Sequence, residues 1–392
     1  MISVTEAKAI LAKNINPLKP VTLSLEKVGG HILAEDIFAI CDIPAFSQSS
    51  MDGYAFNFKD KDQHLKLNGE MAAGTSQQTE IAAGEASRIF TGAPLPNGAD
   101  TVVMQEKVHF ENGFLVVGDE HLKLGSNVRK AGAEVTNGTL AMEKDTLLSP
   151  AAIGFLAQIG IQSVSVYPMP SVAIILTGKE LQTPGQPLSF GQVYEANSFS
   201  LATALTQAGI NDIEIMMADD DLEILRDVLQ QAIETKDVVL LTGGVSVGDY
   251  DFVIQASQLC GVQQLFHKVK QKPGKPLFIG KKNDQFVFGL PGNPSSVLNC
   301  FYNYVLPTLH QLSNKKNSVQ ELTAILTTSY EKPKGLTHFL KGFYADGKVT
   351  PLAEQESFRL SAFSQANCLI CLPEDREIFN AGDQINILHL PH

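Results

Sequence analysis

The feature of the sequence that most constrains the fold is a repeated alternation of short apolar runs with amphipathic helical segments between residues 170 and 305. Uninterrupted apolar runs are typical of strands that are buried on both faces of a sheet. Repeated strand–helix units therefore predict a mostly parallel sheet covered by helices. We expect strands at 172–176, 213–217, 238–241, 277–280 and 286–290, and helices at 197–208, 222–233 and 294–305.

The chain outside this α/β region predicts further domains. Ser3 and Glu6 have the spacing of a capping box at the start of an N-terminal helix, and a second helix is expected over 149–159. Glycine and proline recur between short β-prone runs from 44 to 137, which predicts a β-rich module. We expect the two helices to pack together, so that the β-rich module is an insertion in a split helical domain.

Two hairpins are predicted from residue pairs that favour positive φ. Asn112-Gly113 lies between two apolar runs of the inserted module, and Asp346-Gly347 lies in a strand-like C-terminal region. The predicted domains are 1–43 plus 138–168 for the split helical domain, 44–137 for the inserted β-rich domain, 169–312 for the α/β domain and 318–392 for the C-terminal domain.

Charge and hydropathy argue against several classes of function. The chain has 30 Lys and Arg against 42 Asp and Glu, and the resulting charge of −12 repels nucleic acid. No segment approaches the roughly 18 apolar residues of a membrane span, and the start of the chain lacks the pattern of a secretory signal. We therefore expect a cytoplasmic protein that binds neither nucleic acid nor a membrane.

The five cysteines are scattered and predict neither a disulfide framework nor a zinc site. Cys368 and Cys371 have the spacing of a metal-binding pair, but no second pair completes a tetrahedral set of ligands. Their apolar neighbours favour a buried strand instead.

Three loops of the α/β region carry residues that suit an anion. Adjacent glycines allow backbone N–H groups to converge on a phosphate oxygen, although a glycine-rich turn alone is often only a tight turn. Lysines supply point charges, and a helix N-terminus attracts negative charge. Because the carboxyl ends of parallel strands meet at one edge, these loops together predict a small anionic ligand. The residues are Gly243, Gly244, Lys268, Lys272, Lys275 and Gly292.

Carboxylates accompany these loops and imply a cation. Asp219, Asp220 and Asp221 lie between a predicted strand and a helix, where Asp221 is explained as an N-cap and one of the others can face the ligand. Asp249 and Asp251 follow the glycine-rich turn. Because these groups would repel bound phosphates, Mg²⁺ is the expected bridging ion.

Six motifs, in this order and spread over nearly the whole chain, resemble those of the MoeA family, which includes the C-terminal half of gephyrin. They are PAFxxSSMDGYA at 44–55, FTGAP at 90–94, GADTVVMQE at 98–106, TGGVSVG at 242–248, KPGKP at 272–276 and LPGNP at 290–294.

This resemblance implies a fold, an activity and partners. It implies a homodimer with a molybdopterin-binding α/β domain and a C-terminal β-barrel. The implied reaction takes adenylylated molybdopterin (molybdopterin-AMP) and molybdate, releases AMP and yields the molybdenum cofactor. The implied protein partners are molybdopterin adenylyltransferase and proteins that handle the finished cofactor.

The resemblance also carries roles to particular residues. Glu180, Asp220 and Asp251 are implied as metal ligands, and Asp52 is expected to reach the α/β cleft of the other subunit. The implied catalytic residues are Asp52, Thr91, Glu180, Asp220, Asp251, Lys268 and Lys272. The implied cofactor-binding residues are Thr242, Gly243, Gly244, Ser246, Gly248, Lys275, Pro291, Gly292, Asn293 and Ser357.

The sequence departs from the family pattern at four positions. Lys179 replaces an acidic residue, which excludes a metal ligand there, and Lys341 stands where an Arg is often found. A two-pronged contact of Arg with an anion would become a single point charge with Lys. Glu134 and Glu195 lie where the family has differently placed carboxylates, so neither is assigned a role.

Two other functions remain open from the sequence. A molybdopterin adenylyltransferase would share the α/β domain and consume ATP, but it would not need the inserted module that carries Asp52 and Thr91. A nonenzymatic scaffold that binds the pterin would not need all the anion-binding loops together.

Overall fold

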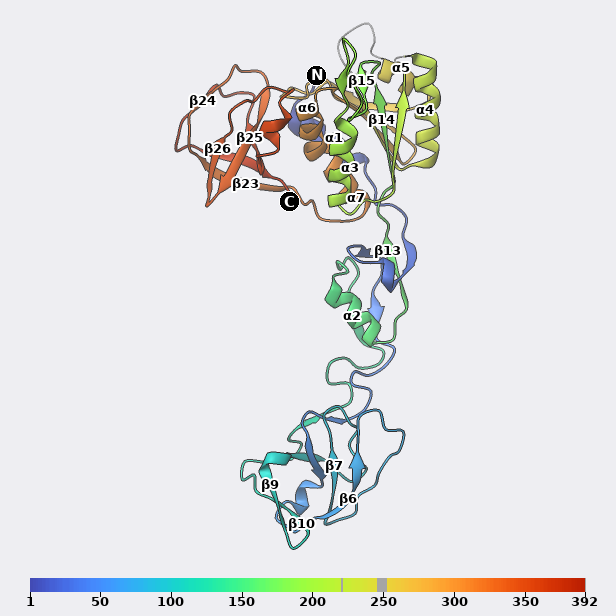
Figure 1. The fold of residues 1–392 in the computed structure, drawn as a ribbon, viewed down its shortest axis with the longest axis vertical. Coiled ribbons are helices and arrows are strands. Elements are labelled where there is room, and N and C mark those ends of the chain that lie inside the picture. Colours follow the sequence, from blue (N-terminus) through green and yellow to red (C-terminus); the bar gives the residue numbers. More distant parts are fainter. Residues whose placement is uncertain (220, 245–251, 392) are drawn as a thin grey trace. The chain divides into compact units, whose positions relative to one another are not determined.

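The computed structural model describes residues 1–219, 221–244 and 252–391, and the chain divides into two compact units (Figure 1). The first unit comprises residues 1–21, 30–32 and 167–392, and the second comprises 22–29 and 33–166. Among the described residues, no helix has the length and apolar character that crossing a membrane would require.

A six-stranded sheet forms the centre of the first unit, in the order β17-β14-β18-β22-β21-β19. Neighbouring strands pair in parallel from β17 to β22, and only β21 runs in the opposite direction, pairing antiparallel with both β22 and β19. The mostly parallel sheet is therefore confirmed. The strands are β14 (Val172–Thr177), β17 (Ile213–Ala218), β18 (Val238–Thr242), β19 (Gln263–His267), β21 (Phe278–Lys282) and β22 (Gln285–Leu290).

Helices cover both faces of this sheet, and its central strands β14 and β18 are buried along their whole length. Ile174 of β14 packs in the same core as α3 (Asn197–Gln207), and the neighbouring Ile175 packs on the other face with α4 (Leu222–Thr235) and α5 (Phe252–Leu259) (Figure 1). The two expected helices 197–208 and 222–233 are confirmed. Asp221 caps α4 by accepting from the amides of Glu223 and Ile224.

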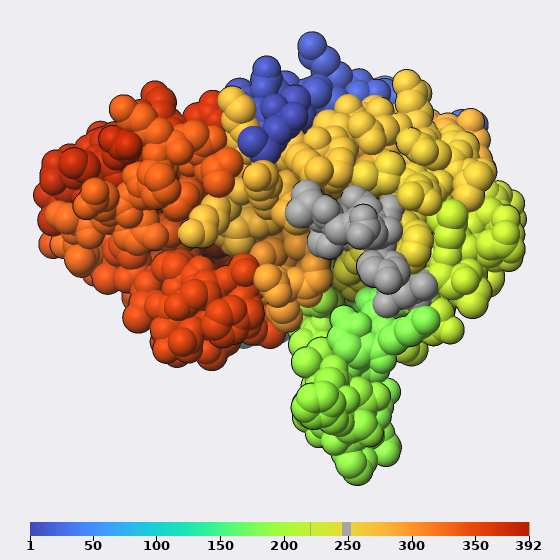
Figure 2. Space-filling model, turned by 90° about the horizontal axis from the view of Figure 1, so that it is seen from above, coloured from blue at the N-terminus to red at the C-terminus, as the bar shows by residue number. Residues whose placement is uncertain are grey.

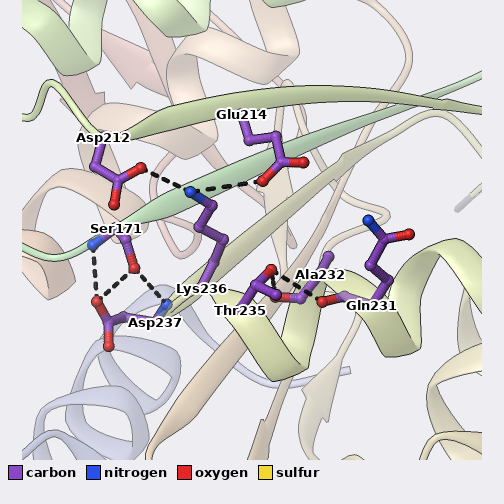
Figure 3. Close-up of polar contacts among 8 residues, drawn as sticks. All are labelled: Ser171, Asp212, Glu214, Gln231, Ala232, Thr235, Lys236 and Asp237. Atoms are coloured by element: carbon purple, nitrogen blue, oxygen red, sulfur yellow. Dashed lines mark hydrogen bonds and ion pairs between the residues drawn. The ribbon is translucent and has the colours of Figure 1, made fainter.

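A polar cluster joins the amino ends of the strands, away from their carboxyl edge (Figure 3). A carboxylate oxygen of Asp237 accepts from the amide and hydroxyl of Ser171, at 2.8 and 2.7 Å. Lys236 forms ion pairs with Asp212 at 2.6 Å and with Glu214 at 3.5 Å. These contacts lie where β14, β17 and β18 begin, and they are suited to holding the strand register rather than to chemistry.

The last helix of the α/β domain is longer than predicted. It begins after Asn293 as α6 (Pro294–Cys300), widens into a π turn at Phe301–Val305 and continues as α7 (Leu306–Leu312). We expected an end near residue 305. Pro307 follows, and it lacks the amide hydrogen that an α-helix needs. The helix passes this proline by way of the π turn instead.

The N-terminal helix α1 (Val4–Asn14) has the predicted capping box of Ser3 and Glu6. Its buried residues Ala7 and Leu11 pack in the core of the α/β domain. The expected packing of this helix with α2 (Pro150–Gln158) is therefore wrong, because α2 contributes Leu156 to a separate core in the second unit. The apolar stripe of α1 could not reveal which apolar surface it covers.

The C-terminal region forms a closed barrel of five strands, as expected. The order is β25-β26-β23-β29-β27, and β27 pairs back with β25. The hairpin at Asp346-Gly347 is confirmed, and Cys368 and Cys371 lie in a strand. The strands are β23 (Gln320–Leu326), β25 (Thr337–Ala345), β26 (Lys348–Pro351), β27 (Cys368–Leu372) and β29 (Gln384–His389).

Several short elements complete the first unit. In addition to its barrel neighbours, β25 pairs with β20 in the α/β domain. These elements are β15 (Leu181–Gln182), β16 (Val193–Tyr194), β20 (Gln271–Lys272), β24 (Tyr330–Glu331), β28 (Ile378–Phe379) and α8 (Leu360–Phe363).

The second unit is β-rich apart from α2, and its hairpin at Asn112-Gly113 is confirmed. Its four-stranded sheet has the order β6-β7-β5-β8, and β13 pairs between β1 and β2. The main strands are β5 (Gly53–Phe56), β6 (Lys66–Met71), β7 (Glu85–Ile89), β8 (Thr101–Met104), β9 (Val108–Glu111), β10 (Phe114–Val117) and β13 (Ser163–Tyr167). The short strands are β1 (Val21–Ser24), β2 (Ile32–Leu33), β3 (Ile37–Phe38), β4 (Gln48–Ser49), β11 (Val128–Arg129) and β12 (Leu140–Met142). The finer division of the chain into four domains stays a prediction.

Candidate functional site

A cleft of about 880 Å³ lies at the carboxyl edge of the parallel strands. It is lined by the loops that follow β14, β18 and β22, by the loop after β20, and by residues of the C-terminal domain. Figure 2 shows the orange and red C-terminal domain beside the yellow segments of the α/β domain. Nine of the predicted ligand-binding residues line the cleft: Glu180, Gly243, Gly244, Lys272, Lys275, Pro291, Gly292, Asn293 and Ser357.

The glycine-rich turn begins where β18 ends and passes very close to the end of β14. Gly243 has φ +91°, and a Cβ atom there would lie 2.8 Å from the carbonyl oxygen of Thr177. A Cβ on Gly292 would lie 3.9 Å from the Cα of Gly243, so the ends of three strands meet here without side chains between them. Thr242 is buried beneath this turn, where its carbonyl accepts from the Thr177 hydroxyl, and it does not line the cleft.

The loop that carries Lys272 and Lys275 is held from within the protein. Gln271 is buried and donates through Nε2 to the carbonyl of Gly274 at 3.0 Å, while the hydroxyl of Tyr304 donates to its Oε1. The two lysines themselves are exposed. Rigid backbone and exposed ammonium groups are the combination that holds an anion without ordering a loop first.

The same loop is tied to the helix that ends the α/β domain. Asn299 of α6 donates to the carbonyl of Pro273 at 3.1 Å. A Cβ on Gly274 would lie 2.6 Å from the sulfur of Cys300, so the close approach of this loop to the helix requires glycine. Burial raises the pKa of the Cys300 thiol to about 12, which makes it a neutral packing group.

Of the two predicted catalytic residues Lys268 and Glu180, only Glu180 lines the cleft. Lys268, for which we predicted the same role as Lys272, does not line the cleft, and its backbone has φ 63°. Glu180 lines the cleft and is exposed. Its carboxylate lies over Gly178, where a Cβ would be 2.7 Å from Oε1. Lys179 is exposed and is not a lining residue.

Glu195 has a structural role. It is buried, and its two carboxylate oxygens accept from the amide and the hydroxyl of Ser198, at 2.7 and 2.6 Å. These bonds satisfy the first turn of α3, whose N-cap residue Ala196 has no side-chain acceptor. The carboxylate of Glu195 is therefore occupied, although the residue borders the cleft.

Asn293 and Ser357 bring the α/β domain and the C-terminal domain together at the cleft. Asn293 is the N-cap residue of α6, but its side chain makes no capping bond. Its Nδ2 instead donates to the hydroxyl oxygen of Ser357 at 2.8 Å. The two residues therefore form one wall, which the sequence could not reveal because 63 residues lie between them.

Lys341 does not supply the expected point charge to an anion. It is buried, and its ammonium donates to the carbonyls of Glu354, Glu356 and Arg359 at 2.8, 3.2 and 3.1 Å. Burial lowers the pKa of its amine. An ammonium has three N–H donors, and all three are used to hold the loop that carries Ser357.

Asn197 is a cleft residue that sequence reasoning did not single out as a site residue. It begins α3 and lines the cleft, and its Nδ2 donates to the carbonyl of Gly292 at 2.9 Å. Gln271, which supports the lysine loop, was also missed. An isolated polar residue in a sequence gives no sign of its partners.

The predicted residues Asp52 and Thr91 lie together in the second unit. The amide and hydroxyl of Thr91 donate to one carboxylate oxygen of Asp52, at 2.8 and 2.9 Å. Both hydrogen bonds lower the pKa of Asp52, and the bond from the amide of Thr91 has the larger effect. The motifs SSMDGYA and FTGAP therefore meet in space and hold an exposed, ionised carboxylate.

Asp220, Ser246, Gly248 and Asp251 lie outside the described residues, as does Asp249. In the described ranges, no group of three or more His, Cys, Asp or Glu side chains is arranged to hold a metal ion.

Comparison with known proteins identifies the family. The model "MoeA N-terminal region (domain I and II)" matches residues 2–160, "Probable molybdopterin binding domain" matches 173–311, and "MoeA C-terminal region (domain IV)" matches 323–390. The molybdopterin molybdenumtransferase of Haemophilus influenzae is 33% identical over 402 residues, which cover 100% of this chain and 99% of that protein. The protein of the same name from a Staphylococcus aureus strain is 32% identical and covers 99% of this chain and 95% of its own.

The fold agrees with these relationships. A crystal structure of the molybdopterin biosynthesis MoeA protein from Pyrococcus horikoshii matches with a TM-score of 0.86 at 28% identity, over 100% of both chains. A crystal structure of a molybdopterin biosynthesis MoeA protein from Pyrococcus horikoshii OT3 matches with a TM-score of 0.78 at 29% identity. The chain therefore belongs to the MoeA family.

Proposed function

We propose that this chain is a cytoplasmic molybdopterin molybdenumtransferase, which inserts molybdate into adenylylated molybdopterin with release of AMP. The observation that carries the proposal is the cleft that combines two exposed lysines with the glycine-rich strand ends inside the probable molybdopterin-binding domain. The full-length relatives of Haemophilus influenzae and Staphylococcus aureus bear this name.

The charge of the cleft suits these substrates. Adenylylated molybdopterin carries a pyrophosphate and molybdate carries two negative charges, so the ammonium groups of Lys272 and Lys275 would draw them together. Ammonium groups that are already in place need not reorganise when negative charge develops in the transition state. Such a site would therefore favour displacement of AMP. The support of this loop by Gln271, Tyr304 and Asn299 is therefore part of the proposed function.

Magnesium is also part of the proposal. Mg²⁺ is usually held by one or two carboxylates together with substrate phosphates. Of the two carboxylates among the described lining residues, Glu195 is engaged with Ser198, whereas Glu180 is exposed. Glu180 therefore fits as the protein ligand, and the ion would neutralise phosphate charge when bound.

Asp52 and Thr91 carry a further part of the proposal, as residues that the reaction requires. Their hydrogen bonds keep a carboxylate ionised and in a fixed place. We also propose that the protein acts as a homodimer that receives its substrate from molybdopterin adenylyltransferase and passes the product to cofactor-handling proteins.

The experiment uses purified protein, adenylylated molybdopterin, molybdate and Mg²⁺, and it measures AMP release by chromatography. We expect the Lys272→Ala and Asp52→Ala proteins to lose most of this activity. Lys348→Ala is the matched control, because Lys348 is exposed in β26 and does not line the cleft. Equal activity of Lys272→Ala and Lys348→Ala would contradict the proposal. In a parallel reaction with molybdopterin and ATP, ATP consumption by a protein that releases no AMP in the first assay would favour an adenylyltransferase.

A further inference from the structure

The side-chain amide of Asn197 is fixed in one orientation at the wall of the cleft. Its Nδ2 donates to the carbonyl of Gly292 at 2.9 Å. The flipped orientation would set two oxygen acceptors against each other, so Oδ1 must point away from Gly292. This Oδ1 is buried, and in the part of the chain that the structure describes no donor reaches it.

Asn197 is not needed to complete the helix that it begins. The amide of Ser198 in the first turn of α3 is satisfied by Glu195. The side chain of Asn197 makes no bond to that turn, and its hydrogen bond goes instead to the neighbouring loop at Gly292. A buried acceptor without a donor costs free energy and is uncommon in folded proteins, so it calls for an explanation.

The partner of this oxygen has to be a hydrogen-bond donor. Phosphate and molybdate oxygens are acceptors in their ionised forms, and Asn197 Oδ1 would repel them. The cleft therefore offers two kinds of contact: ammonium groups at Lys272 and Lys275 for the anionic part of a ligand, and an acceptor at Asn197 for a part that carries N–H groups.

We infer that Asn197 is a specificity-determining residue whose Oδ1 accepts a hydrogen bond from the exocyclic amino group of the ligand's heterocycle. The inference rests on the proposed function, because adenylylated molybdopterin carries such an amino group on its pterin and another on its adenine. A site built to accept from a donor rejects analogues that lack it, since the buried acceptor is then left unpaired.

The test compares ligands that differ by one amino group. Isothermal titration calorimetry would give the Kd of AMP and of purine riboside monophosphate, and the Kd of pterin and of its 2-deamino analogue. Each ligand is measured with the wild-type protein and with Asn197→Leu, which has a side chain of similar size. Asn197→Ala is the second variant, and thermal unfolding of both shows that they are folded.

The wild-type protein should prefer the amino-bearing member of one pair by about fivefold to tenfold, as one hydrogen bond predicts. This preference should vanish in both variants, and the pair that shows it identifies the heterocycle that contacts Asn197. A preference that persists in the variants overturns the inference, as does an equal loss of affinity for both members of each pair. Mg²⁺ binding that disappears with Asn197→Leu would also overturn it. A wild-type protein that binds neither AMP nor pterin would contradict the proposed function itself.

Discussion

The replacement Lys341→Met removes a buried cation and keeps the shape of its side chain. The residue is 3% exposed, and its ammonium holds the carbonyls of Glu354, Glu356 and Arg359. Each hydrogen bond to a charged group contributes about 1.5–3 kcal/mol. The cost of burying the ammonium offsets several kcal/mol of the sum over the three bonds. We expect a net loss of about 2–4 kcal/mol, which lowers the melting temperature of a domain of this size by roughly 5–12 °C.

Urea unfolding and differential scanning calorimetry of Lys341→Met would measure this loss. Lys348→Met is the control, because this exposed lysine lies in the same barrel and its replacement should change stability by less than about 0.5 kcal/mol. The variant should also bind molybdate more weakly, since the loop that positions Ser357 against Asn293 is released. A loss no greater than that of the control would refute the assignment of Lys341 as the clamp of this loop.

Three further predictions concern other parts of the molecule. Gly274→Ala should lower anion affinity in calorimetry more than Gly125→Ala, where a Cβ meets open space, because a Cβ at 274 lies 2.6 Å from the sulfur of Cys300. Thr91→Val should raise the pKa of Asp52 toward 3.8, since it removes one of the two hydrogen bonds that depress this pKa; NMR titration of the carboxyl group would measure it, and an unchanged pKa would contradict the geometry. Because the folded-state pKa of Asp52 is depressed, its contribution to stability is present above the unfolded pKa and is lost as pH falls through the folded one. Asp237→Ala should destabilise the first unit by about 1–3 kcal/mol in urea unfolding, because it removes a partly buried acceptor, and Asp237→Asn should restore part of that loss.

The parallel sheet could be predicted because its central strands contain uninterrupted apolar runs. Val172 to Leu176 has no polar residue, and both faces of β14 are buried against helices. The edge strand β19 was missed, because Gln263 and Gln264 give it neither an apolar run nor a strict alternation. Edge strands have one exposed side, so their sequences are under weaker constraint.

The loops of the cleft could be predicted because glycine indicates a backbone position with positive φ or close approach, and lysine indicates a positive charge. Gly243 and Gly274 stand at positive φ where a Cβ would collide, and this necessity is visible in the sequence itself. The contacts of Lys341, Asn197 and Asn293 could not be predicted, because each joins residues that the fold alone brings together. The packing of α1 was predicted wrongly for the same reason, since its apolar stripe could cover any apolar surface.

If this chain couples molybdate to the release of AMP, both products should appear together in one reaction. Purified protein, adenylylated molybdopterin and Mg²⁺ would be titrated with molybdate, while AMP and active molybdenum cofactor are measured over time. We expect AMP release to require molybdate and cofactor to form in equimolar amount, and we expect Lys272→Ala to weaken both while Lys348→Ala changes neither. Tight binding of the pterin without AMP release at any molybdate concentration would contradict molybdate insertion and would indicate a carrier or scaffold.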